Sequence, residues 1–67
     1  MDRDQLISKM LKTIEENPGI RPKDLNRLLN LEHSAGLRNS LIKQGFVIKQ
    51  KVGQAVKYYA TAKKKNL

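Results

Sequence analysis

The spacing of apolar residues predicts a helix near the start of the chain. One face at the helical repeat of about 3.6 residues is made by Leu6, Ile7, Met10, Leu11 and Ile14. Asp2 is placed to cap this helix, with Gln5 three residues further on. Asn17-Pro18-Gly19 ends it, because proline cannot continue the hydrogen-bond ladder and glycine supplies the turn.

Two shorter helices are expected next. Pro22 suits the first turn of a helix over about residues 22–29, with an apolar face made by Leu25, Leu28 and Leu29. Ile20, between the first two helices, is expected to form a very short strand. The third helix covers about residues 34–44, and Gly45 closes it. Its buried face carries Leu37 and Leu41.

After Gly45 the apolar repeat changes from helical to alternating, which predicts a β-hairpin. The strands are expected at about residues 46–51 and 55–61, with Gly53 in the turn. Alternation from Phe46 places the lysines on the face opposite the apolar side chains Phe46, Ile48, Val56 and Tyr58. Residues 1–62 then form one domain, and residues 63–67 form a basic tail without regular structure.

Charge separates the two halves of the chain. Fourteen Lys and Arg oppose six Asp and Glu, for a net charge of +8. Residues 1–37 hold six bases and six acids, whereas residues 38–67 hold eight bases and no acid. A surface designed only for solubility mixes both signs. A one-sided basic field instead favours binding to a polyanion such as nucleic acid.

The predicted order is helix, strand, helix, helix, strand, strand, which is an α+β arrangement containing a helix-turn-helix. In this order the chain resembles the winged-helix superfamily, in the style of small archaeal, bacterial and viral transcription regulators. The matching segments are residues 25–31, 37–47 and 57–61, and the resemblance covers about residues 5–62. It implies a three-helix winged helix-turn-helix that binds double-stranded DNA, with the third helix in the major groove and the hairpin, or wing, on the backbone. The binding is expected to be either sequence-specific or architectural, with transcriptional regulation as the role.

Candidate DNA contacts on the third helix follow from its polar side. With Leu37 and Leu41 facing the core, Asn39, Ser40 and Lys43 point away from it. Asn39 suits a bidentate contact with adenine, Lys43 suits guanine or phosphate, and Ser40 suits phosphate or a base. Arg38, nearer the core edge, is expected to reach a phosphate. Ser34, at the start of this helix, completes the set. The alternative is that this side of the third helix is an ordinary solvent-exposed face with no binding role.

Candidate contacts on the wing are Lys49, Lys51 and Lys57, with Gln54 at the tip reaching toward a minor groove. Two of these lysines are expected to oppose each other across the hairpin, where like charges are destabilising. Phosphates would neutralise that repulsion. The alternative is a charged edge that prevents strand-to-strand aggregation. On the second helix, Arg21, Lys23 and Arg27 are further candidates for the backbone.

Two other functions stay open from the sequence. Winged helices also serve as protein-interaction subunits of larger complexes, although here the outer face of the third helix is polar and lies beside a basic wing. RNA binding is the other, but the two adjacent tyrosines supply only one outward ring for stacking. The oligomeric state stays open between monomer and homodimer.

Enzyme chemistry, cofactors and small-molecule ligands find no support. The chain has no cysteine and one histidine, His33, so a metal site is not expected. Glu15 and Glu16 are adjacent on a helix and cannot face each other as an acid/base pair.

No apolar run approaches the roughly 20 residues of a membrane span. We therefore expect a protein of the cytoplasm, associated with the nucleoid.

Overall fold

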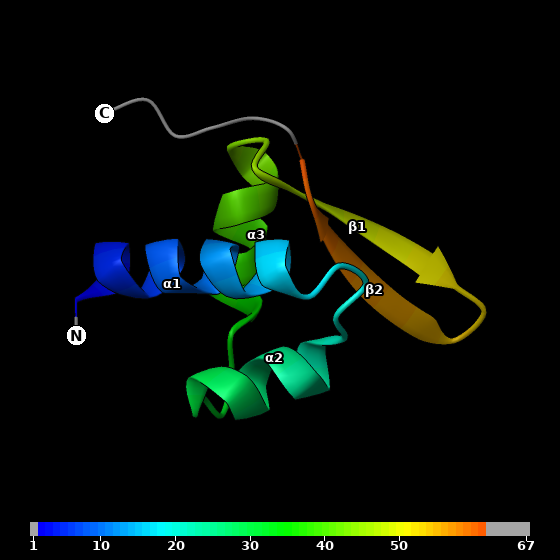
Figure 1. The fold of residues 1–67 in the computed structure, drawn as a ribbon, viewed down its shortest axis with the longest axis horizontal. Helices are drawn as coiled ribbons and strands as arrows, with labels where there is room; N and C mark the ends of the chain where they lie inside the picture. The colour runs from blue at the N-terminus through cyan, green and yellow to red at the C-terminus, as the bar shows by residue number, and fades with distance from the viewer. Residues whose placement is uncertain (1, 62–67) are drawn as a thin grey trace.

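The computed structural model describes residues 2–61 of the chain. Its helices are α1 (Arg3–Glu16), α2 (Pro22–Leu29) and α3 (Ala35–Lys43). They are followed by the strands β1 (Val47–Val52) and β2 (Ala55–Ala60). Figure 1 shows the three helices gathered together, with the hairpin tip extending beyond them to one side. The element types and order are as predicted, and each helix end lies within about two residues of its expected position.

The first helix begins and ends at the predicted signals. The Asp2 carboxylate accepts a hydrogen bond from the backbone N–H of Gln5 at 2.8 Å, which satisfies one free donor of the first turn. Asn17 ends the helix, and Gly19 follows with a φ of +81°. A Cβ at Gly19 would lie 3.3 Å from the Tyr59 hydroxyl, so both the backbone and the available space require glycine there.

The second helix is buried on a narrower face than its leucines predict. Leu25 and Leu29 are buried, but Leu28 is 58% exposed. The expectation that Leu28 joins the core is therefore wrong. Successive helical residues turn by about 100°, so Leu28 points well away from Leu29 toward solvent. Asn30 ends the helix in the left-handed conformation, with a φ of 56°, which asparagine tolerates better than most residues.

The hairpin is a two-stranded antiparallel sheet, and Ile20 adds a single residue to its free side along β2. The Tyr58 N–H donates to the Ile20 carbonyl at 2.9 Å, and the Gly19 N–H donates to the Tyr58 carbonyl at 2.9 Å. These bonds confirm the very short strand expected at Ile20. They also attach the base of the wing to the link between α1 and α2.

The strand register corrects the predicted faces of the wing. Lys49 lies opposite Tyr58, and Lys51 lies opposite Val56. Directly opposed residues of an antiparallel pair share a face, so these lysines lie on the same face as Tyr58 and Val56, not on the opposite one. Phe46 and Val47 are both buried, at 7% and 1% exposed. Phe46 precedes the strand, so the alternation along β1 begins with the inward side chain of Val47.

Lys57 lies opposite Gln50, on the other face of the hairpin. That outer face also carries Ile48 and Val52, each 53% exposed. No two lysines oppose each other within the hairpin of the described residues. The expected like-charge repulsion across the strands is therefore absent, and it gives no argument for a phosphate partner.

The core draws on all three helices, both strands and the links between them. Its buried members are Met10, Ile14, Ile20, Leu25, Leu29, Leu37, Leu41, Phe46, Val47 and Tyr58. A core of this size in a 67-residue chain gives a modest stability, of roughly 3–10 kcal/mol. Within residues 2–61, no helix is long and apolar enough to span a bilayer. The tail predicted at residues 63–67 lies outside the described residues.

Candidate nucleic-acid interface

The third helix presents a polar face away from the core. Leu37 and Leu41 are buried, whereas Gly36, Asn39 and Lys43 are exposed. A Cβ at Gly36 would meet nothing within 4 Å, so this face is open. Asn39 and Lys43 are therefore exposed on this face, as their sequence positions predict, and their contact with DNA stays a prediction.

Ser40 and Ser34 differ sharply in exposure. Ser40 is half-buried, and its hydroxyl accepts a hydrogen bond from the Gln44 side-chain amide at 3.0 Å. Ser34 is only 2% exposed. Its hydroxyl donates to the Asn26 side-chain oxygen of α2. Ser34 thus ties the start of α3 to α2, and the expected contact of its hydroxyl with DNA stays a prediction that this burial does not favour.

Arg38 points toward the wing rather than straight outward. Its Nη1 donates to the Tyr58 hydroxyl at 3.0 Å, and its Cζ lies 5.5 Å from the centre of the Tyr58 ring. These distances combine a hydrogen bond with a cation–π contact. The Arg38 Nε is buried without a hydrogen-bond partner in the described part of the chain.

Two of the predicted wing lysines are brought to the side of α3. Lys49 and Lys51 are exposed and share the hairpin face of Tyr58, the residue that Arg38 of α3 contacts. We call this the inner face of the wing. Gln54 is exposed in the turn at the tip. Lys57 is half-buried on the outer face, so the structure does not group it with the other two.

A groove between α2 and the wing adds basic residues that the sequence suggested only weakly. It is lined by Arg21, Pro22, Lys23, Gln54, Ala55 and Val56. The start of α2 and the tip of the hairpin are more than thirty residues apart along the chain. The sequence shows that Arg21 and Lys23 are basic, but only the tertiary fold shows that they lie beside the wing.

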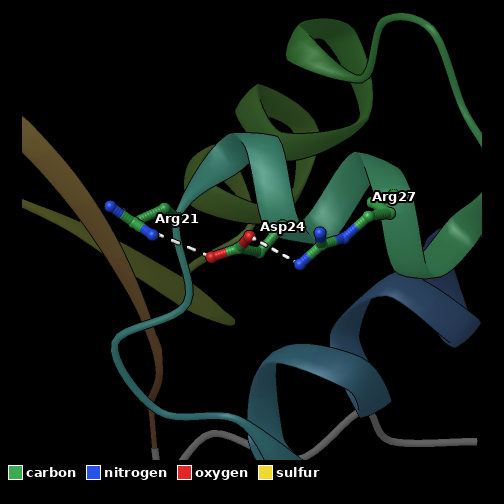
Figure 2. Close-up of polar contacts among 3 residues, drawn as sticks. All are labelled: Arg21, Asp24 and Arg27. Atoms are coloured by element: carbon green, nitrogen blue, oxygen red, sulfur yellow. Dashed lines mark hydrogen bonds and ion pairs between the residues drawn. The ribbon is translucent and has the colours of Figure 1, made fainter.

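The carboxylate of Asp24 binds two arginines on the exposed side of α2. Figure 2 shows Asp24 between them: Arg21 Nε lies 3.4 Å from Oδ2, and Arg27 Nη2 lies 3.1 Å from Oδ1. The arginine side chains are 63% and 78% exposed. Such surface pairs contribute little to stability. Their main effect is to hold both guanidinium groups near one negative charge.

The described residues offer little for other site chemistry. No three His, Asp or Glu side chains within residues 2–61 are grouped so that they could hold a metal ion. A second groove is lined by side chains from the starts of α1 and α3, including Arg3, His33 and Leu37. Ser34 lies beside His33 in this lining, but its hydroxyl donates to Asn26 and not to His33, so the two do not form a nucleophile and base pair.

Comparison with known proteins supports the fold. No protein-family model matches the chain, and no curated protein matches it. A solved structure that does match is that of the transcriptional regulator SlyA, with a TM-score of 0.74 and 24% sequence identity. The match covers 85% of this chain and 43% of the SlyA chain, so this protein spans less than half of that regulator's length. The fold is an α+β winged helix-turn-helix, as the sequence predicts.

Proposed function

We propose that this protein binds double-stranded DNA and regulates transcription, with α3 in the major groove and the inner face of the wing on the neighbouring backbone. The SlyA chain that shares its fold is a transcriptional regulator. The major groove, about 12 Å wide, admits an α-helix. The exposed face of α3 presents Asn39 and Lys43 for that groove.

The observation that carries the proposal is the shared side of the basic groups. Lys49 and Lys51 lie on the hairpin face that Arg38 reaches from α3. Within α3 and the hairpin, there is no Asp or Glu to oppose them. A helix and hairpin that carry basic residues and no carboxylate suit binding to the phosphates of a duplex.

The residues take different roles in the proposed complex. Asn39 reads a base, because an amide side chain both donates and accepts hydrogen bonds and so matches adenine. Lys49 and Lys51 contact phosphates, which position the protein without reading sequence. Lys43, on the same face of α3 as Asn39, contacts guanine or phosphate. Arg21 and Lys23, beside the wing tip, extend the same basic surface toward the backbone.

The test contrasts one residue of each role after selection of a preferred duplex. Asn39→Ala is expected to weaken binding to that duplex by roughly 1–3 kcal/mol and to leave binding to random duplexes almost unchanged. Lys49→Ala is expected to weaken binding to both by a similar factor. If Asn39→Ala weakens every duplex equally, Asn39 does not read bases. If a folded protein binds no duplex at low salt, the proposal fails and the scaffold role gains support.

A further inference from the structure

The wing is buried mainly near its base, although Val56 of β2, further toward the tip, also packs on the core. Val47 and Tyr58 are buried there, whereas every residue from Ile48 to Gln54 is exposed. A two-stranded hairpin without further packing is marginally stable in water. Lys49 lies opposite Tyr58 and Lys51 lies opposite Val56, so the direction of both lysines depends on how β2 is held to the helices.

One such contact links the wing to α3 through side chains. Arg38 of α3 donates from Nη1 to the Tyr58 hydroxyl at 3.0 Å and lies 5.5 Å from the ring centre. Tyr58 is itself held through its backbone, which exchanges two hydrogen bonds with the Gly19–Ile20 link. The guanidinium thus links α3 to β2, which pairs with β1 along one edge and with Ile20 on the other.

This contact is not what core packing alone would select. A guanidinium that is partly withdrawn from water, with Nε buried and unpartnered, carries a desolvation cost. The ion pairs of the described residues all involve Asp24 on α2, so no carboxylate offsets the charge of Arg38. An apolar side chain would fill the same space at lower cost. What arginine adds is a planar group that fixes direction through stacking and a hydrogen bond together.

We propose that Arg38 is a positioning residue: its contact with Tyr58 fixes the angle between α3 and the wing. This proposal rests on the proposed function, because the fixed angle matters when Lys49 and Lys51 must meet phosphates while α3 occupies the groove. The role differs from the phosphate contact expected from the sequence. The Arg38–Tyr58 contact sets where the lysines stand, and the lysines supply the charge.

The first experiment needs no DNA. The chain has no cysteine, so Asn39→Cys and Gln54→Cys place two spin labels, on α3 and on the wing tip. Pulsed electron paramagnetic resonance then measures the distance distribution between the labels. Tyr58→Phe removes only the acceptor hydroxyl and is expected to shift the distribution or widen it about twofold, because the hairpin alone is weakly held. Tyr59→Phe, which removes the neighbouring hydroxyl on the outer face, is the matched control and should change nothing.

The second experiment asks whether the contact acts through the wing lysines. In the parent protein, Lys49→Ala is expected to weaken duplex binding about fivefold near 0.1 M salt. In the Tyr58→Phe background, Lys49→Ala should weaken binding less than about twofold, because a lysine that is no longer directed at a phosphate contributes little to the affinity. In the Tyr59→Phe background the full effect should remain. Circular dichroism confirms that each variant is folded, and Arg38→Lys, which keeps the charge but not the planar group, replaces Tyr58→Phe if that variant unfolds.

The outcomes separate this inference from the proposed function. An unchanged distance distribution in Tyr58→Phe and Arg38→Lys overturns the positioning role, whether or not the protein binds DNA. Equal effects of Lys49→Ala in all backgrounds overturn it as well, while duplex binding by the parent protein keeps the proposed function intact. A parent protein that binds no duplex refutes the proposed function, and the distance measurement still decides the role of Arg38 in the fold.

Discussion

Replacing Ser34 by alanine tests whether this residue belongs to the fold or to the DNA interface. Ser34 is 2% exposed, and its hydroxyl donates to the Asn26 side chain, joining α3 to α2. Ser34→Ala removes the donor and leaves the Asn26 oxygen without it. Losing a hydrogen bond of this kind costs about 1–2 kcal/mol, at the lower end because Asn26 is only half-buried. In a domain of this size each kcal/mol lowers Tm by about 4–8 °C, so we expect a fall of roughly 4–16 °C.

Thermal unfolding followed by circular dichroism measures the loss of stability. Duplex binding at a temperature where the variant is folded measures any direct role of Ser34 at the DNA interface. Ser40→Ala is the matched control, because Ser40 lies on the same helix and its bond to Gln44 is near the surface. We expect Ser40→Ala to change stability by less than about 0.5 kcal/mol. Ser34→Ala should bind duplex normally while still folded. A variant with unchanged Tm and weakened DNA binding would refute the structural role.

Other substitutions test the faces of the wing, the open site at Gly36 and the charge of Asp24. Lys49→Ala and Lys51→Ala should each lower the slope of log affinity against log salt by about one, whereas Lys57→Ala on the outer face should lower it by less than half as much; equal slopes would contradict the assignment of faces. Gly36→Ala should raise the free energy of unfolding by about 0.5–1 kcal/mol in urea titrations, because the helical site is open and alanine favours helix; a loss would show that the site is crowded. Asp24→Asn should strengthen binding to random duplex and steepen its salt dependence, because Asp24 no longer holds two arginines; weaker binding would mean that Asp24 orients them for DNA.

Local signals made the helices predictable from sequence. Asp2 caps the first helix, and Pro22 fits the first turn of a helix but not its interior. Gly45 adopts a φ of 85°, which suits the end of a helix. Each of these residues acts on its immediate neighbours, so no tertiary information is needed. The change from helical to alternating apolar spacing after Gly45 similarly marks the start of the hairpin.

The faces of the wing could not be predicted in the same way. Phe46, Val47 and Ile48 are three apolar residues in succession, so alternation can start from either phase. The structure buries Phe46 between the end of α3 and β1, and this places Val47 inside and Ile48 outside. A shift of one residue exchanges every side chain between the two faces. Lys49 and Lys51 are therefore exposed as expected but share the face of Tyr58 and Val56, whereas Lys57 lies on the opposite face as expected but is half-buried.

Long-range contacts explain the remaining differences at the candidate site. Ser34 looks like a polar residue at the start of an exposed helix, but Asn26, eight residues earlier, covers it. Arg38 looks like a free basic side chain, but Tyr58, twenty residues later, holds it. Neither partner is marked by local spacing. The exposure of Asn39 and Lys43 is predictable, because it depends only on the helical repeat relative to Leu37 and Leu41.

Whether this protein binds double-stranded DNA is decided by duplex binding measured across a range of salt. Fluorescence anisotropy is measured with a labelled random duplex, and with single-stranded DNA and double-stranded RNA in parallel. We expect a clear preference for duplex DNA, with log affinity falling against log salt at a slope of several units, as for about four to six phosphates. Absence of duplex binding at low salt by a folded protein would contradict this expectation, as would equal binding to all three nucleic acids.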